Sequence, residues 1–112
     1  MEKEFLSVSI TKITTGITIC LLSAFAGWAQ GDIKDIFLDK CSVCHGPDGA
    51  GKTAKGKKLK VKDIHETIKS ESEAEMIKIL TDGKGKDMDG FGKDFKPEQI
   101  KGLVQYYRSL AK

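Results

Sequence analysis

Two thiols and an imidazole lie within one run of five residues, Cys41-Ser42-Val43-Cys44-His45. On a helix, residues three and four apart share one face, so Cys41, Cys44 and His45 point the same way. Two thiols at this spacing can add to the two vinyl groups of a haem, while the adjacent imidazole reaches its iron. The spacing therefore predicts a haem held covalently by Cys41 and Cys44, with His45 as an iron ligand.

Two other kinds of site use cysteine and histidine, and the sequence favours neither. A structural zinc site needs four ligands, and beyond the cluster the chain offers only Cys20, inside an apolar leader, and His65. A thioredoxin-like redox pair belongs in a βαβ unit, which the downstream sequence does not supply. No loop brings His65 opposite His45, so we expect His65 to be a surface or hydrogen-bonding histidine.

A lone methionine stands in a polar loop rich in glycine, residues 83–92. Met88 is either exposed there or bound to the iron, because a flexible loop can lay its thioether sulfur on the haem face opposite His45. Met76 is the competing candidate, but its apolar helical neighbours predict a place in the core. We expect Met88 to be the second axial ligand.

The first 29 residues have the features of a secretory signal peptide. The apolar run at 13–26 is shorter than the roughly 20 residues that span a bilayer, and residues 24–26 fit the A-x-A cleavage pattern. The start of the chain is acidic rather than basic, which leaves an uncleaved membrane anchor as the alternative. We expect a signal peptide over 1–29 and one periplasmic domain over 30–112.

The composition is that of a globular protein, with 31% charged and 39% hydrophobic residues. The net charge of +3 is modest and does not indicate nucleic acid binding. Six lysines nevertheless crowd one stretch: Lys52, Lys55, Lys57, Lys58, Lys60 and Lys62. This lysine cluster is either a solvated loop or a docking patch for an acidic partner. A domain this short also buries little apolar surface alone, so a bound macrocycle would complete its core.

Helical spacing predicts that the five-residue motif ends the first helix. Ile33 and Phe37 recur at helical spacing, and Asp32 is a plausible N-cap. The turn that follows, residues 46–51, is rich in glycine. We expect one of its backbone carbonyls to accept a hydrogen bond from the second ring nitrogen of His45, as metal-bound histidines require.

Two more helices follow from capping signals. The Ser-x-x-Glu pattern at residues 70–73 predicts a helix over 71–81, ended by Gly83. Pro97 is a favoured first residue for the last helix, whose apolar face should pack on Ile33 and Phe37. That face comprises Ile100, Leu103, Val104, Tyr107 and Leu110. No stretch alternates with the period of a strand, so the sequence predicts an all-α domain.

In this order the residues resemble a class I monohaem cytochrome c of the short bacterial type. The resemblance rests on the CxxCH motif with its glycine-rich turn, the lysine cluster, the methionine loop and the terminal segment at 103–110. It implies a small cytochrome c fold, about three to four helices wrapped round one haem c, with the first and last helices crossing. By position it also implies thioethers from Cys41 and Cys44, a proximal His45 and a distal Met88.

The chain departs from this family beside the distal ligand. The family usually has Met-Pro-x-Phe, whereas this chain has Met88-Asp89-Gly90-Phe91. Because the loop lacks the stiffening proline ring, we expect a softer bond between sulfur and iron. We also expect Lys84 or Lys86 to replace Met88 at high pH.

The resemblance implies a monomeric electron carrier in the periplasm rather than an enzyme. Its expected partners are a quinol-oxidising complex, a terminal oxidase or reductase, or a dehydrogenase, with membrane contact only if the leader is retained. One alternative is a haem subunit of a larger oxidoreductase. The other is a haem that binds a gas or peroxide at an open sixth position, which requires Met88 to be absent from the iron.

Overall fold

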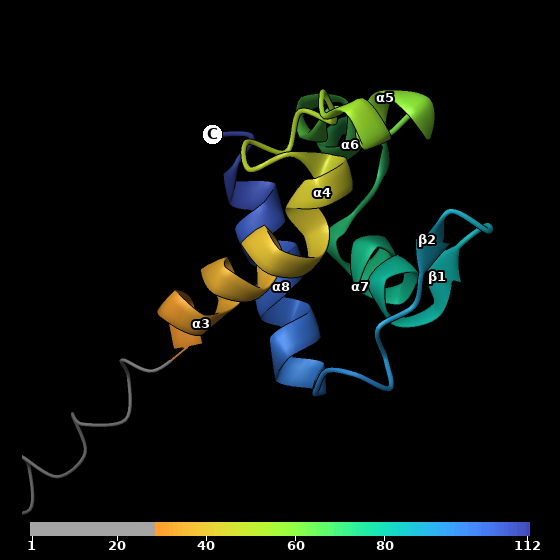
Figure 1. The fold of residues 1–112 in the computed structure, drawn as a ribbon. Helices are drawn as coiled ribbons and strands as arrows, with labels where there is room; N and C mark the ends of the chain where they lie inside the picture. The colour runs from red at the N-terminus through yellow and green to blue at the C-terminus, as the bar shows by residue number, and fades with distance from the viewer. Residues whose placement is uncertain (1–28) are drawn as a thin grey trace, which may run out of the picture.

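The computed structural model describes residues 29–112 (Figure 1). All of the expected signal peptide but its last residue therefore lies outside the described residues. Within them, no helix has the length and apolarity to cross a membrane. The elements run in the order α3 (Ala29–Ile36), a π-helix (Phe37–Cys41), α4 (Ser42–His45), α5 (Ala54–Lys58), α6 (Ile64–Ser70), α7 (Glu73–Asp82), β1 (Gly83–Lys84), β2 (Met88–Asp89) and α8 (Pro97–Ser109).

The expected first helix is present, and it ends on the motif as predicted. It is built from α3, the π-helix and α4, and the wider hydrogen bonding of the π-helix is visible where the Ser42 N–H donates to the Phe37 carbonyl. The N-cap prediction for Asp32 is wrong, because α3 begins at Ala29 and Asp32 lies inside its first turn. Short π-helices often occur at functional sites, and this one ends at Cys41.

The capping box of α7 lies two residues later than the sequence pattern suggested. Ser72 is the N-cap: its N–H donates to Glu75 Oε2 at 2.7 Å, and its hydroxyl accepts from the Glu75 N–H at 3.2 Å. Two Ser-x-x-Glu frames overlap in the sequence, but Ser70 is the last residue of α6 and is unavailable as a cap. The end of the helix at Gly83 is confirmed, and its φ of 88° suits glycine.

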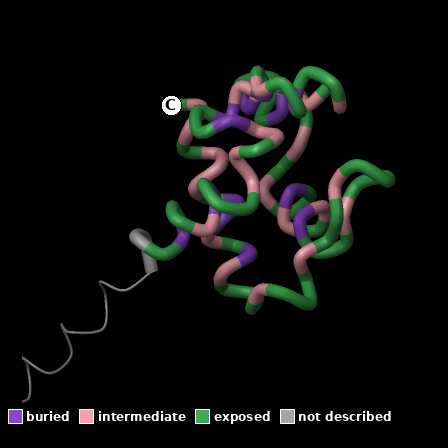
Figure 2. Tube along the Cα trace, viewed as in Figure 1, coloured by how far each residue is buried: buried purple, intermediate pink, exposed green. Residues whose placement is uncertain are grey.

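The core lies where α3 and α7 meet α8, as expected for crossing first and last helices. A Cβ at Gly102 of α8 would lie 3.0 Å from the side chain of Ile33, so this glycine allows the close crossing. Phe37 stacks on Tyr107 with ring centroids 6.1 Å apart. The buried apolar residues, purple in Figure 2, are Ile33, Phe37, Ile64, Met76, Leu80, Ile100, Leu103 and Val104.

The methionine loop contains a small hairpin that the sequence analysis did not predict. Its strands β1 and β2 are antiparallel, with Gly83 opposite Asp89 and Lys84 opposite Met88. These are the two strands of the described residues, so the fold remains mostly helical. The hairpin matters because it gives Met88 a defined place.

Candidate functional site

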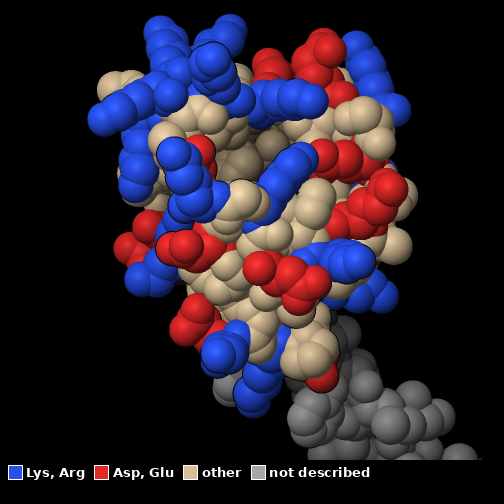
Figure 3. All heavy atoms as spheres, turned by 90° about the vertical axis from the view of Figure 1, so that its right-hand side faces the viewer, with Lys and Arg blue, Asp and Glu red and all other residues tan. Residues whose placement is uncertain are grey.

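A cavity of about 480 Å³ brings the four predicted site residues together. Cys41 comes from the π-helix and Cys44 and His45 from α4, while Met88 comes from the hairpin, which lies apart from α4 in Figure 1. The face that carries α5 and the hairpin is hollowed in Figure 3. The rest of the lining is mainly apolar, with side chains from the π-helix, α7 and α8.

His45 lies at the cavity with its imidazole largely removed from solvent. Burial lowers its pKa below the usual 6.5, which keeps the imidazole neutral and leaves a ring lone pair free for a metal. The edge of its ring meets Tyr107 with centroids 5.0 Å apart. These contacts fix the ring at the cavity wall.

The carbonyl acceptor expected for His45 is not present. Its Nδ1 is buried and has no hydrogen-bond partner among the described residues. Within the turn that follows, the Gly51 N–H donates to the His45 carbonyl at 2.8 Å and the Gly49 N–H to that of Gly46 at 3.1 Å. A buried ring nitrogen without a hydrogen-bond partner is uncommon. The described residues therefore leave the hydrogen-bonding capacity of this imidazole unsatisfied.

The two cysteines are free thiols, and both are half-buried. Burial raises the pKa of Cys41 to about 11, and the neighbouring Cys44 adds to this rise. Both thiols line the cavity, where addition to a vinyl group requires reduced sulfur at the surface of the bound ring. Their state and position therefore fit covalent attachment.

Helix α5 packs against the backbone of the motif, and its Lys55 also lines the cavity. Thr53, its N-cap, accepts a hydrogen bond from the Gly56 N–H and donates from Oγ1 to the Val43 carbonyl at 2.7 Å. A Cβ at Gly56 would lie only 2.2 Å from the Cys44 carbonyl oxygen. The helix therefore packs directly on the backbone of the motif, at a distance that only glycine permits.

Met88 is half-buried, and the backbone of its hairpin is tied to α7. The Phe91 N–H donates to the Leu80 carbonyl at 2.8 Å, and the Gly92 N–H to that of Thr81 at 3.1 Å. Met76 is a core residue as predicted, only 5% exposed, but its side chain also lines the cavity. The structure thus brings both methionines to the same space.

Sequence reasoning missed two features of the cavity wall. Tyr107 was predicted only as part of the apolar face of the last helix, yet it lines the cavity and burial raises its pKa to about 12. Periodicity shows that a residue is buried and does not show what it faces. Lys40 and Lys84 also reach the lining, from outside the lysine cluster.

The lysine cluster lies partly at this cavity. All six of its members are exposed, and Lys55, Lys60 and Lys62 contribute to the lining. In Figure 3, basic side chains crowd the upper left of the hollow and also border its right side, while acidic side chains lie to its right and below it. The entrance of the cavity is therefore asymmetric in charge.

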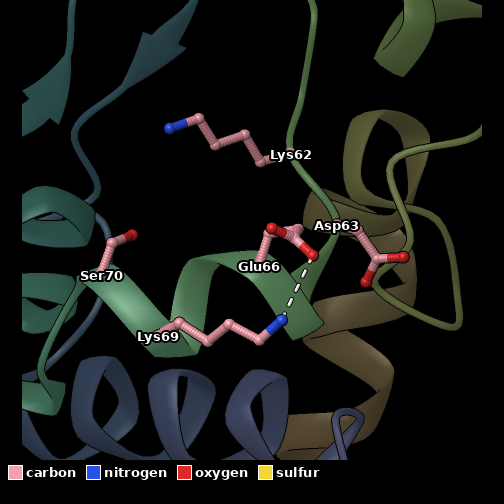
Figure 4. Close-up of a pocket in the computed structure, with 5 residues that line it drawn as sticks. All are labelled: Lys62, Asp63, Glu66, Lys69 and Ser70. Carbon is pink, nitrogen blue, oxygen red and sulfur yellow. Dashed lines mark hydrogen bonds and ion pairs between the residues drawn. The ribbon is translucent and has the colours of Figure 1, made fainter.

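His65 lies outside the cavity, as predicted. Its Nδ1 is 2.8 Å from Asp63 Oδ1. The His65 backbone N–H donates to the same oxygen at 2.9 Å, and this backbone hydrogen bond, followed by the one to the ring, lowers the pKa of Asp63 below its usual value. A second, shallow pocket beside it is lined by Lys62, Asp63, Glu66, Lys69 and Ser70 (Figure 4). It contains none of the predicted site residues.

The donor set fits a haem c. Two reduced thiols, a neutral imidazole and a thioether line one mainly apolar cavity, and these are the groups that c-type attachment and His/Met ligation use. A set of at least three His, Cys, Asp or Glu side chains suited to a bare metal ion is absent from residues 29–112. The site is suited to a prosthetic group rather than to an ion alone.

Comparison with known proteins points the same way. A family model described as cytochrome c oxidase, cbb3-type, subunit III matches residues 29–106. The chain is 29% identical, over 93 residues, to the cbb3-type cytochrome c oxidase subunit FixP of Azorhizobium caulinodans, covering 78% of this chain and 31% of that protein. It therefore spans about a third of the length of this curated relative. A solved structure, the KustC0563 c-type cytochrome, is similar with a TM-score of 0.64 and 28% identity, covering 70% of this chain and 96% of that one.

Proposed function

The chain belongs to the cytochrome c family described as cbb3-type cytochrome c oxidase subunit III, and from this premise we propose that it is a periplasmic carrier of single electrons. Its cofactor is covalently bound haem c, and its chemistry is electron transfer. Cytochrome c domains lie outside the cytoplasm, and a cleaved signal peptide over 1–29 would release this domain, residues 30–112, into the periplasm. When bound, the haem supplies an iron that changes its oxidation state by one electron.

The observation that carries the proposal is the shared cavity of His45 and Met88. In the proposed arrangement Cys41 and Cys44 hold the ring through thioethers, His45 is the proximal ligand and Met88 the distal ligand. With both axial positions filled, no position is left for a substrate, and the thioether favours a higher reduction potential. Phe37 and Tyr107 help to keep water from the proximal side.

A second candidate function is favoured by the relative whose name is printed as an oxidase subunit. FixP is about three times as long as the stretch that this chain matches, so the match covers a haem domain and not the whole relative. In this candidate the protein performs the same electron transfer inside a complex. The partners in either case are redox proteins: a quinol-oxidising complex, a terminal oxidase or reductase, or a dehydrogenase.

Optical spectra of the full chain, produced in a host that attaches haem c, test the proposal. We expect haem that stays bound after acid extraction, and a weak sulfur-to-iron band in the red for the oxidised form. Bound haem without this band would remove Met88 from the iron and favour an open sixth position that binds a gas or peroxide. Extraction of all the haem would overturn the proposal.

Purification from the native cell separates the carrier from the subunit. A free carrier is recovered as a soluble monomer. Recovery at a fixed ratio with the subunits of an oxidase would favour the second candidate instead.

A further inference from the structure

The hairpin that carries Met88 needs something to hold it in place. Its strands are only two residues long each, and a hairpin this short is marginal by itself. Backbone hydrogen bonds from Phe91 and Gly92 tie its C-terminal arm to α7, and its N-terminal arm continues directly from α7 at Gly83, whose N–H donates to the Ile79 carbonyl. The residue after Met88 is Asp89, so no proline ring stiffens the backbone there.

An ion pair from Lys84, beyond the end of α7, links the hairpin to a separate segment of the chain. Lys84 Nζ lies 2.8 Å from Glu71 Oε1, 13 positions earlier in the chain. The other three ion pairs of the described residues join neighbours no more than three positions apart. The pair between Glu71 and Lys84 is therefore the one that connects two separate elements.

Glu71 is well placed to act as the fixed end of this pair. Its N–H donates to the Thr67 carbonyl at 2.9 Å, and its own carbonyl accepts from Arg108 Nη1 at 3.3 Å. These bonds tie it to α6 and α8. Its side chain is only 21% exposed, which makes it the most shielded ion-pair partner among the described residues. Water therefore screens this pair less than an ordinary surface pair.

Lys84 is placed to transmit this restraint to Met88. The two residues are direct partners across the hairpin, and directly opposed residues of an antiparallel pair have their side chains on one face. Both side chains line the cavity, as does Glu71. A force that holds Lys84 therefore also holds the strand that carries the thioether.

We propose that the ion pair between Glu71 and Lys84 is a latch that keeps the Met88 hairpin seated over the cavity. It would restrain the methionine loop, as the proline after the methionine does in the related family. Glu71 and Lys84 are positioning residues, and the effect on iron rests on the proposed function, in which Met88 is the distal ligand. Loss of the latch makes Met88 easier to displace.

Imidazole titration of the oxidised holoprotein measures that displacement through loss of the red band. We expect Glu71→Gln and Lys84→Gln each to bind imidazole about two- to fivefold more tightly than the wild type, the effect of losing a partly exposed ion pair. The double variant should match either single variant, because each one already breaks the pair. Lys84→Arg retains the pair and should resemble the wild type.

Lys86→Gln is the matched control, with all titrations run at neutral pH, below the high pH at which Lys84 or Lys86 is expected to replace Met88. It removes the same charge from the turn of the same hairpin, and Lys86 has no ion-pair partner among residues 29–112. Two results together would overturn the latch. They are an equal imidazole affinity in Lys84→Gln and Lys86→Gln, and a wild-type imidazole affinity in Glu71→Gln.

Amide hydrogen exchange across residues 83–92 of the holoprotein gives a second readout that does not depend on the iron ligand. We expect faster exchange in Glu71→Gln and Lys84→Gln than in Lys86→Gln. If the wild type lacked the red band, the proposal that Met88 binds the iron would fail, but the amide exchange rates would still test the latch. Equal exchange in all three variants would remove the latch even with the band present.

Discussion

The two methionines of the cavity differ in how the protein surrounds them. Met76 is almost fully buried in the core, and its sulfur lies 3.7 Å from Arg108 Nη1. Met88 is half-buried, and the hairpin that carries it is short. Replacing each residue in turn should therefore have opposite consequences for stability and for iron ligation.

We expect Met88→Ala to abolish the sulfur-to-iron band and lower the reduction potential, because the thioether that favours the reduced state is gone. Met76→Ala should keep the band but lower the free energy of unfolding by about 2–5 kcal/mol, the usual range for emptying a core methionine site. Optical spectra, redox titration and denaturant unfolding measure these effects. If the sulfur-to-iron band persisted in Met88→Ala and disappeared in Met76→Ala, Met76 would be the iron ligand in place of Met88.

Residue types and spacing predict which residues form the site, but they do not predict the contacts of those residues. The positions of Cys41, Cys44 and His45 on one helical face follow from local spacing, and the structure places all three at one cavity. The unsatisfied Nδ1 of His45 does not follow from spacing. It depends on where the backbone of the turn at residues 46–51 runs relative to the ring. The edge contact of Tyr107 is likewise set by how α8 crosses the motif.

At the scale of the elements, glycines set how closely the helices approach the motif. An alanine in place of a helical glycine ordinarily adds up to about 1 kcal/mol of stability. Gly56 of α5 is an exception, because its Cβ would lie 2.2 Å from the backbone oxygen of Cys44 and 2.6 Å from that of Gly51. Backbone atoms cannot turn aside as the end of a side chain can.

We therefore expect Gly56→Ala to lower the free energy of unfolding by about 1–3 kcal/mol, the cost of overpacking, and to reduce the yield of attached haem. Gly102→Ala is the matched control, since its Cβ would meet only the side chain of Ile33, at 3.0 Å from Cδ1, and no backbone atom, so that a shift of this side chain by a few tenths of an ångström would relieve the contact. It should stay within about 1 kcal/mol of the wild type. Denaturant unfolding of both holoproteins measures the difference, and equal losses would contradict close packing of α5 on the motif.

The capping box of α7 makes stability depend on pH. Hydrogen bonds from the backbone and hydroxyl of Ser72 lower the pKa of Glu75 below its usual 4.5. A carboxyl whose pKa is lower in the folded state contributes stability above its unfolded pKa, and this contribution is lost as the pH falls through the folded value. Acid should therefore weaken the start of α7.

Glu75→Gln tests whether the capping box causes this acid sensitivity. The amide oxygen of glutamine still accepts from the Ser72 N–H, but the side chain no longer titrates. We expect the variant to lose less stability than the wild type between neutral pH and about pH 3, measured by urea unfolding midpoints. Glu98→Gln, which removes an exposed carboxylate from the first turn of α8, is the control. An acid dependence identical in Glu75→Gln and the wild type would show that the box does not contribute.

Three helices were predictable from the sequence, but their exact frames were not. Helices α5 (Ala54–Lys58) and α6 (Ile64–Ser70) were missed because the lysine-rich stretch of residues 52–70 was interpreted as a loop. The helix ending on the motif and the helix from Pro97 follow from periodicity and start signals. The hairpin at β1 and β2 was missed because strands of two residues show no period. The frame of α7 was misplaced by two residues because α6 extends to Ser70, which a local pattern does not reveal.

At the scale of the whole molecule, the distribution of charge matters more than its net value. The net charge is only +3, yet the lysine cluster lies partly at the entrance of the cavity. A charged surface at the entrance of a site attracts partners of opposite sign and speeds their association at low salt. The position of the lysines therefore favours an acidic partner at the face through which electrons would enter and leave.

The double variant Lys55→Gln/Lys60→Gln removes two exposed lysines that line the cavity, whereas Lys34→Gln/Lys101→Gln removes two exposed lysines elsewhere, with the same change in net charge. We expect the first variant to react about three- to tenfold more slowly with a small anionic oxidant at low ionic strength, and the second to change little. The difference should vanish at high salt, where the Debye length falls to about 3 Å. Stopped-flow oxidation of the reduced holoprotein over a range of salt concentrations measures this. Equal slowing in both variants would mean that net charge alone guides the encounter, and the lysine cluster would then be a solvated loop without a docking role.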